Sequence, residues 1–235
     1  TKLNHFCDSY GLKPFNVIQS VFAILLHRFS YEKDIVMGTP VSGRTLAELE
    51  SVIGMFVNTV TLRTTLTDGI SLLELVRQNQ TNFFEVLGNQ DIPFDLVVEA
   101  LNPSRVTNVP PVFQILFSML DVDKQDVLGE LQVTTINPEI QQVKCDIELA
   151  VERTSEYLDC CWSFKASIFK ESSIRLMAEA FNSLLSYLLE HPEEPLDKVS
   201  FNQAKVAQNN DLALSPKAVE YQLESVICQF EQQAK

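Results

Sequence analysis

Apolar residues recur along this chain with two periods, one typical of helices and one typical of strands. A spacing of three to four residues places apolar side chains on one side of a helix, whereas strict alternation places them on one face of a strand. The helical spacing predicts helices over Leu3–Tyr10, Pro14–Phe29, Ser71–Leu87, Phe94–Leu101 and Glu171–Glu190. Alternation or short apolar runs predict strands over Asp34–Ser42, Val57–Leu66, Val112–Leu120, Leu131–Ile136, Asp146–Glu152 and Leu158–Phe164.

Two copies of one capping pattern add helix starts to this outline. Thr45-x-x-Glu48 and Ser71-x-x-Glu74 each place a hydroxyl three residues before a carboxylate. In a capping box, these two groups each pair a backbone N–H that the first helical turn leaves free. We therefore expect a short helix from Thr45 that ends near Gly54, where glycine would adopt positive φ, and a longer helix from Ser71.

Helices and strands of comparable weight, with several strands in direct succession, predict an α+β fold built on one mostly β sheet. Gly38 and Pro40 predict an irregular or edge end of the first strand. The apolar run 112–120 predicts a central strand covered on both faces, and strands 146–152 and 158–164 predict a hairpin. After Pro195 the chain becomes polar, which predicts a linker over 196–216 and one terminal helix over 218–233.

Composition excludes several classes of partner. The chain has 235 residues, of which 46% are hydrophobic and 21% charged, as in ordinary globular proteins. Its formal net charge of -13 argues against nucleic acid and anionic membranes, which clustered Lys and Arg would bind. No apolar run reaches the roughly 18 to 20 residues of a membrane span. We expect no nucleic-acid partner and no membrane association.

The five cysteines have no CxxC spacing, so they predict neither a zinc site nor a thioredoxin-like site. Their odd number and the lack of a recognisable signal peptide favour a reducing, cytoplasmic location. Cys160 and Cys161 are neighbours in a predicted strand and point to opposite faces, so we expect them to serve as small packing residues. Because the sequence begins at Thr1, we interpret it as a fragment or a processed piece.

General-base chemistry has no legible centre in this sequence. The only histidines are His5, His27 and His191, and none has the paired, positioned partner that a general base needs. His27 lies in an apolar helix and is expected to be a structural histidine with a hydrogen-bond partner. No arrangement of Ser, His and Asp or of Cys and His suggests a nucleophile, and we predict no catalytic residue and no metal ligand.

Several motifs occur together in a recognisable order. They are DIVMGTPVSGR (34–44), IGMFVNTVTLR (53–63), NQDIPFD (89–95), SRVTNVPPVFQILFSML (104–120), CDIELAVER (145–153) and the helix over 171–190 that ends in HPEEP. This series resembles the second half of the condensation domains of non-ribosomal peptide synthetases, over roughly residues 1–200. Asn89 stands where histidine is commoner in that family, and the motif around Ser104 is degraded at its start. The family's HHxxxDG motif is absent from the chain.

The resemblance implies a chloramphenicol-acetyltransferase-like lobe, of the CoA-dependent acyltransferase type, with a mostly antiparallel or mixed sheet flanked by helices. In that family, two such lobes enclose a tunnel. There, the amine of an acceptor aminoacyl thioester attacks a donor acyl thioester, and the second histidine of HHxxxDG helps position or deprotonate the amine. We therefore predict that residues 1–200 form the C-terminal subdomain, which forms no peptide bond alone. Residues 201–235 are predicted to be a linker toward an adenylation domain together with the start of that domain.

The same resemblance implies the partners. They are the N-terminal lobe of the same domain, peptidyl or aminoacyl carrier proteins, and the adjacent adenylation domain. No cofactor is bound directly, because the carrier proteins present phosphopantetheine. A crossing segment onto the other lobe is expected within 120–144.

Five residues are candidates for the surface that faces the tunnel: Gly54, Asn58, Arg63, Gln90 and Asp91. Each has a local alternative or an open question. Asn58 can pair exposed backbone near a bend, and Asp91 can cap the helix that starts at Pro93. Arg63 needs a carboxylate or carbonyl partner, which lies either in this chain or in the missing lobe.

Two other functions stay open at this point. One is another acyltransferase of the same superfamily, such as a polyketide-associated or alcohol-acylating enzyme. The other is a non-catalytic interaction lobe that associates with carrier domains, adenylation domains or itself, as a homo-oligomer. An exposed apolar face would favour the second.

Overall fold

The computed structural model describes residues 2–103, 110–121, 143–154 and 157–199. They belong to one unit, Thr1–Phe201, while the second unit, Asn202–Lys235, falls outside the described residues. The helices are α1 (Lys2–Tyr10), α2 (Pro14–Ser30), the 3-10 helix η1 (Ala47–Leu49), α3 (Leu72–Gly88), α4 (Phe94–Leu101) and α5 (Glu171–Glu190). The strands are β1 (Asp34–Val41), β2 (Asn58–Thr65), β3 (Ile115–Asp121), β4 (Ile147–Arg153) and β5 (Leu158–Phe164).

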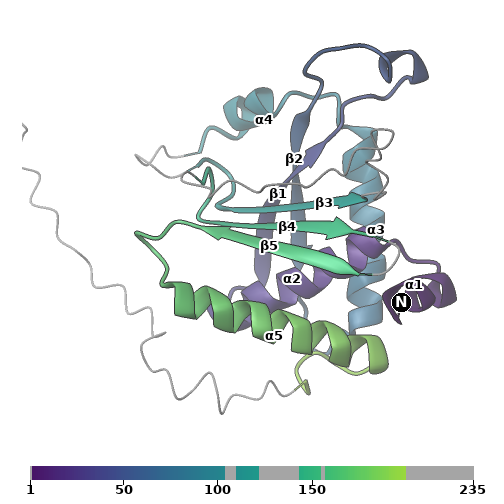
Figure 1. Cartoon of the computed structure of the whole chain (residues 1–235), viewed down its shortest axis with the longest axis vertical. Helices are drawn as coiled ribbons and strands as arrows, with labels where there is room; N and C mark the ends of the chain where they lie inside the picture. Colours follow the sequence, from purple (N-terminus) through teal and green to yellow (C-terminus); the bar gives the residue numbers. More distant parts are fainter. Residues whose placement is uncertain (1, 104–109, 122–142, 155–156, 200–235) are drawn as a thin grey trace, which may run out of the picture. The chain divides into compact units, whose positions relative to one another are not determined.

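The five strands form one mixed sheet in the order β2-β1-β3-β4-β5 (Figure 1). β1 pairs antiparallel with β2 and parallel with β3, and β3 pairs parallel with β4. β4 and β5 form the predicted hairpin, with Arg153 opposite Leu158 and Ile147 opposite Phe164. The predicted α+β class with a mixed sheet and flanking helices is confirmed.

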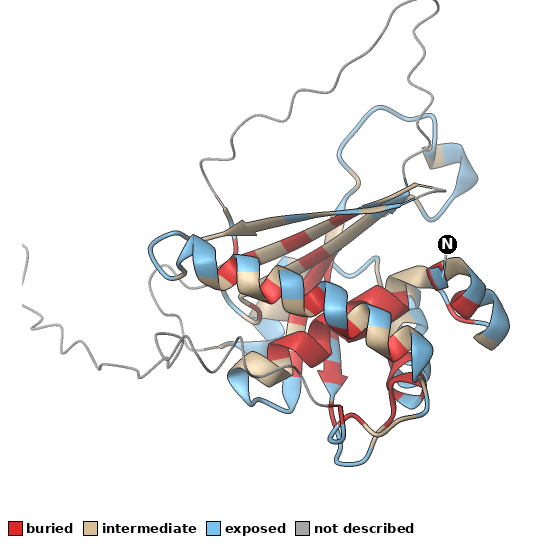
Figure 2. Cartoon of the chain, turned by 60° about the horizontal axis from the view of Figure 1, so that its bottom comes forward, coloured by how far each residue is buried: buried red, intermediate tan, exposed pale blue. Residues whose placement is uncertain are grey.

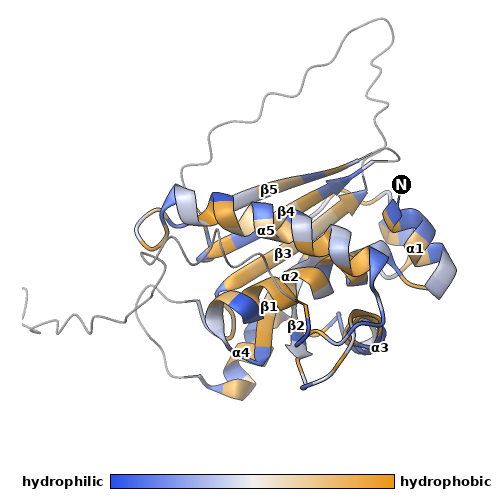
Figure 3. Ribbon diagram, turned by 90° about the horizontal axis from the view of Figure 1, so that it is seen from below, coloured by the Kyte–Doolittle hydropathy of each residue, from blue (hydrophilic) through white to orange (hydrophobic). Residues whose placement is uncertain are grey.

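Helices α2, α3 and α5 pack together over one face of the sheet, and α2 lies between the other two. α2 is buried over most of its length because nearly every residue from Asn16 to Leu26 is shielded from water. Buried residues recur along the strands, where Figure 2 colours them red; they include Ile35, Met37, Leu62, Phe117, Leu149 and Val151. The strand register places these six residues on one face of the sheet. Figure 3 shows the hydrophobic colour along α2 and β1, two elements that contribute many buried residues. The core therefore lies between this helical layer and the sheet.

A chain of buried polar side chains fixes β2 against α2 and α3. Gln19 Nε2 donates to Thr64 Oγ1 at 2.9 Å, and Thr64 Oγ1 donates to Asn79 Oδ1 at 3.2 Å. Asn79 Nδ2 donates in turn to Ser20 Oγ at 2.8 Å. Buried polar groups that are satisfied in this way specify one arrangement of the elements that carry them. The network therefore sets the position of β2, the strand that carries Asn58 and Arg63.

The sheet differs from the sequence-based expectation at β1 and β3. β1 is an interior strand, not an edge strand, but it pairs with β3 through only one residue pair, Gly38 with Leu116. The hydrogen bond from Leu66 N to Lys33 O sets the register of β1 against β2, in which the backbone N–H groups of even-numbered β1 residues point away from β2. Position 40 therefore faces the side of β1 that is largely unpaired, where a proline without an N–H is tolerated. β3 is central, but its Leu120 is 62% exposed, so the strand is not covered on both faces.

Only one of the two capping patterns forms a capping box. Glu74 N donates to Ser71 Oγ at 3.3 Å and Ser71 N donates to Glu74 Oε2 at 3.0 Å, as predicted. Thr45 begins no helix: the only helical turn nearby is η1, which follows Leu46 and has no side-chain cap. The prediction at Thr45 was wrong because Arg44 organises this stretch instead.

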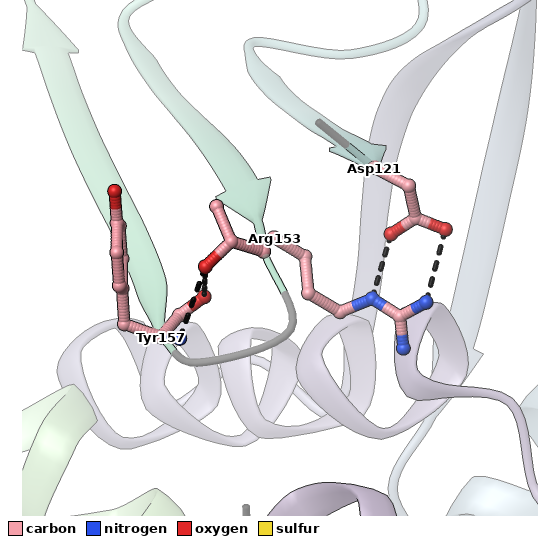
Figure 4. Close-up of polar contacts among 4 residues, drawn as sticks. Asp121, Arg153 and Tyr157 are labelled. Atoms are coloured by element: carbon pink, nitrogen blue, oxygen red, sulfur yellow. Dashed lines mark hydrogen bonds and ion pairs between the residues drawn. The ribbon is translucent and has the colours of Figure 1, made fainter. Parts of the chain in front are cut away.

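The end of β3 is held to β4 by an ion pair. Arg153 Nε and Nη2 bind Asp121 Oδ1 and Oδ2 at 2.6 and 3.0 Å (Figure 4). Several predicted segments lie outside the described residues: the strand 131–136, most of the crossing segment 120–144, and the terminal helix 218–233. Of the predicted linker 196–216, only the start is described. Within the described ranges, no helix has the length and apolarity to cross a bilayer.

Candidate functional site

Asn58 ties the first residue of β2 to the segment that precedes α4. Its Nδ2 donates to the carbonyl oxygens of Gln90 and Ile92 at 2.8 and 2.7 Å. Its Oδ1 accepts from Phe94 N at 3.3 Å and from Thr59 N at 2.9 Å. The side chain therefore uses both ends of its amide to join two segments more than thirty residues apart, and it confirms the expectation that Asn58 pairs backbone near a bend.

This arrangement corrects the role expected of Asp91. α4 begins after Pro93, and the side chain at this N-cap position makes no hydrogen bond to the helix. The free N–H of Phe94 is instead paired by Asn58 from a distant strand. Asp91 is exposed beside this junction, and Gln90 contributes its backbone carbonyl to Asn58. The sequence analysis did not predict this cap, because a cap supplied by a distant strand leaves no pattern of local spacing.

An open groove of about 370 Å³ lies between β2, α3 and the junction before α4. Its walls are mostly uncharged, with hydroxyl, amide and apolar side chains, and Arg63 and Glu85 are the charged residues. The other lining residues are Thr59, Val60, Thr61, Asn82, Val86, Asn89, Ile92, Phe94 and Val97. A groove of this composition suits an extended neutral chain that offers amide groups and apolar atoms.

The aromatic ring of Phe94 connects this groove to the sheet. Phe94 packs against Phe113 with ring centroids 5.4 Å apart. The Phe113 ring lies over Gly38 so closely that a Cβ at position 38 would come within 2.3 Å of it. Glycine at this point of β1 therefore allows the aromatic pair to seat α4 on the sheet.

Arg63 finds its partner within this chain. Its Nε and Nη2 bind the two carboxylate oxygens of Asp34 on β1, with distances of 2.9 and 2.8 Å. Both side chains are largely exposed. The hydrogen bonds from Arg63 lower the pKa of Asp34 below its usual value, and Asp34 raises the pKa of Arg63. The guanidinium at the groove is therefore oriented by a fixed carboxylate, a partner that becomes visible only once the strand register is known.

Gly54 lies in the exposed loop that leads into β2, outside the lining of the groove. It belongs to the exposed stretch between η1 and β2, and its carbonyl accepts from Arg44 Nη2 at 3.4 Å. Its φ is not positive, unlike that of Gly11, Gly43 and Gly69, so the expected helix-ending conformation was wrong. Among the described residues, the hydrogen bonds of Asn58 go to Thr59, Gln90, Ile92 and Phe94 and not to Gly54, which is also not one of the groove's lining residues. The structure thus brings Asn58 and Gln90 into contact, with Asp91 beside them and Arg63 in the groove.

Among the residues that the structure describes, no histidine or cysteine lines the groove. His27 Nδ1 is 2.7 Å from the carbonyl of Glu32, as expected of a structural histidine, and His5 and His191 are exposed on α1 and after α5. Burial raises the pKa of the Cys7, Cys145 and Cys160 thiols to about 11, which keeps them protonated at neutral pH. Among the described residues, no three potential metal ligands lie together.

Comparison with known proteins identifies the family of this chain. The model of the condensation domain family matches residues 1–209. The chain belongs to this family. It is 30% identical over 230 residues to a linear gramicidin synthase of Brevibacillus parabrevis and 26% identical over 235 residues to surfactin synthase subunit 1 of Bacillus subtilis. These matches cover 90% and 99% of the chain but only 4% and 7% of the two synthases.

Solved condensation domains share the fold. The four-domain non-ribosomal peptide synthetase holo-AB3403, solved with AMP and glycine, matches 85% of this chain with a TM-score of 0.77 and 26% identity, over 16% of its own length. The X-domain from teicoplanin biosynthesis matches with a TM-score of 0.74 at 21% identity, over 46% of its length. The condensation domain of the Monacolin K polyketide synthase matches with a TM-score of 0.75 at 17% identity, over 45% of its length. The predicted acyltransferase-like fold is thereby confirmed.

Proposed function

We propose that this chain is the C-terminal lobe of a condensation domain of a non-ribosomal peptide synthetase, and that it forms one wall of the tunnel in which carrier-bound thioesters are joined. The observation that carries the proposal is coverage. Chains solved as single domains of this fold are matched over only 43–46% of their length, although 79–85% of this chain takes part. The segment present holds the motifs of the second half of the domain and lacks HHxxxDG.

The geometry at the groove supports a role in positioning. The reaction forms a C–N bond between the acceptor amine and the donor carbonyl and breaks the donor C–S bond, releasing a thiol. A proton must leave the amine, and the described groove offers no imidazole to take it. Its amide, hydroxyl and apolar groups can instead hold an extended acyl or aminoacyl chain. Asn58, Gln90 and Asp91 at the junction and Arg63 on β2 are the residues we place at or beside this wall, and Gly54 belongs to the adjoining exposed loop.

The partners follow from the same proposal. The N-terminal lobe supplies the histidine, two carrier proteins present the donor and acceptor on phosphopantetheine, and an adenylation domain follows the lobe. Residues 1–200 then form the lobe, and residues 201–235 form the linker toward the adenylation domain and its start. Surfactin and gramicidin synthases, which the chain resembles, are consistent with this setting.

A condensation assay tests the proposal. The chain is mixed with a donor carrier and an acceptor carrier, each loaded with an amino acid, and the acceptor carrier is examined by mass spectrometry for a dipeptidyl thioester. We expect no product from the chain alone, because the proton-accepting lobe is missing. We expect product when the preceding part of a condensation domain is added. Turnover by the chain alone would contradict the assignment.

A further inference from the structure

The outer edge of β2 offers backbone hydrogen-bonding groups to a ligand. β2 is the last strand in the order β2-β1-β3-β4-β5, and among the described residues no strand pairs with its outer side. The hydrogen bond from Leu66 N to Lys33 O sets a register in which even-numbered β2 residues direct their backbone groups toward β1. The N–H and C=O groups of Thr61 and Arg63 therefore point away from the sheet.

The open groove lies against this free edge. Thr59, Thr61 and Arg63 line it from β2, and Asn82 and Val86 line it from α3. Backbone groups on one side of a strand recur about every 6.6 Å, which is also the repeat of a second extended chain. An extended peptide can therefore pair with β2 as an additional strand, while its side chains lie in the groove.

A small polar pocket adjoins the groove and contains a buried acceptor without a partner. The pocket has a volume of about 20 Å³ and shares Arg63, Asn82 and Val86 with the lining of the groove. Asn16 lines it as well and is only 1% exposed. Asn16 Nδ2 donates to Gln80 Oε1 at 3.3 Å, but Asn16 Oδ1 has no hydrogen-bond partner in the described part of the chain. The pocket has room for one group of the size of a water molecule, and a hydroxyl or amide N–H placed there would satisfy this acceptor.

Charge narrows the chemistry of the ligand. Arg63 and Glu85 are the charged residues of the groove lining, and their formal charges cancel. The whole chain carries a formal net charge of -13, which repels an acidic ligand. The remaining lining groups are hydroxyl, amide and apolar side chains. An uncharged peptide in an extended conformation matches both the walls of the groove and the backbone groups at its edge.

We propose that β2 binds an uncharged peptide as an additional strand along Thr61 and Arg63, and that Asn16 Oδ1 selects a peptide side chain that ends in a small hydrogen-bond donor. The identity of the peptide rests on the proposed function: it is the chain carried as a thioester. Backbone pairing holds any extended peptide, whereas the buried acceptor distinguishes serine from alanine. A site with an unpaired buried polar group discriminates in this way because the wrong ligand leaves the group unpaired.

The first experiment compares two neutral peptides on the unaltered full chain. Acetyl-Val-Ser-Val-Ser-Val-amide and acetyl-Val-Ala-Val-Ala-Val-amide are titrated into the isotope-labelled chain, and binding is followed by two-dimensional NMR. The amide signals of Thr61 and Arg63 should move with both peptides, and the serine peptide should bind about five- to tenfold more tightly. If neither signal moves, strand addition is contradicted. Equal affinities would show that the pocket holds only water and would contradict the role of Asn16.

The second experiment uses variants with a matched control. Thr61→Pro removes an outward N–H without removing a hydrogen bond to β1, so it should weaken both peptides about tenfold or more. Thr65→Pro makes the same change on the same edge at an exposed position outside the groove lining, and it should alter affinity by less than about twofold. Asn16→Leu should remove the preference for serine and leave the affinity for the alanine peptide nearly unchanged. Equal losses from the two proline variants, or a serine preference that persists in Asn16→Leu, would contradict the proposal.

The outcomes keep this inference apart from the proposed function. Peptide binding is measured on this chain alone, so it needs neither the preceding half of the domain nor the carriers. If the peptides bind at β2 but the condensation assay gives no product with the other half, the binding site stands and the proposed function fails. If the assay gives product but neither peptide shifts Thr61 and Arg63, the groove is not the peptide site. Circular dichroism checks the fold of each variant, and the comparison of the two peptides needs no variant at all.

Discussion

Asn58 shows how much a single partly buried amide can organise. Four backbone groups depend on it: the carbonyls of Gln90 and Ile92 and the N–H groups of Thr59 and Phe94. These groups fix the edge of the groove and the start of α4 at once. Any effect of Asn58 on the reaction therefore acts through position, since nothing in its chemistry moves a proton.

Replacing Asn58 by alanine should lower the free energy of unfolding by about 1–3 kcal/mol, because several backbone groups lose their partner together. Urea unfolding checks the value, and hydrogen exchange of the Phe94 amide should become faster. Gln90→Ala is the matched control: Gln90 offers Asn58 only its backbone carbonyl, so this change should stay within about 0.5 kcal/mol. Equal stability of the two variants would contradict the role of Asn58 in holding these backbone groups.

Arg63 and Asp34 give a pH-dependent signature. The folded-state pKa of Asp34 is lowered from 3.8, so the pair contributes stability above that pH and loses it as the pH falls through the lowered value. Arg63→Gln should therefore lower the melting temperature slightly at pH 7, and the difference from the unaltered chain should shrink below pH 3.8. The effect is small because both side chains are exposed. A difference that grows on acidification would contradict the pairing.

At the scale of the residue, the sequence motifs singled out Asn58, Arg63 and the segment around Gln90 as candidates for the surface that faces the tunnel, which stays a prediction. The sequence could not provide the contacts. Asp34 pairs with Arg63 across two strands, and Asn58 caps a helix from 36 residues away, so both depend on tertiary register. Arg44, which binds carbonyls in the stretch 46–57, was missed, although a glycine and an arginine directly after a strand were the available signal.

At the scale of the element, the two similar capping patterns provide a direct comparison. Ser71 forms a capping box and Thr45 does not. Ser71→Ala should cost about 1 kcal/mol of unfolding free energy, the usual value for a lost N-cap hydroxyl. Thr45→Ala should change stability by less than about 0.5 kcal/mol. Urea titrations of both variants check this pair, and a larger loss at Thr45 than at Ser71 would be inconsistent with the structure.

Most elements follow from the pattern of apolar residues. The helices α1, α2, α3, α4 and α5 and the strands β1 to β5 all occur near their predicted positions, because each buries one regular face or is buried throughout. The failures share a cause. Thr45 and Gly54 were assigned local roles, but Arg44 reaches across the turn and determines its conformation. Pro40 suggested an edge strand, whereas the register points position 40 away from β2 and toward β3, which pairs with β1 only at Gly38.

At the scale of the whole molecule, the described residues divide into a well-packed side and a more exposed side. The helices and one face of the sheet bury the core, while the exposed stretch 46–57, α4 and the groove lie outside it. A lobe that meets a partner is expected to leave such a surface open. The order of the motifs predicted membership of the family, but the extent of the uncovered surface required the structure.

The central claim is that the proton-handling histidine of the reaction lies outside this chain. The most direct measurement is dipeptide formation by the chain combined with the preceding half of a condensation domain, using loaded carriers. We predict that the triple variant His5→Ala, His27→Gln, His191→Ala forms the dipeptide at an unchanged rate. Replacing the second histidine of HHxxxDG in the other half should abolish the reaction. Loss of product from the triple variant, while circular dichroism shows it folded, would contradict the claim.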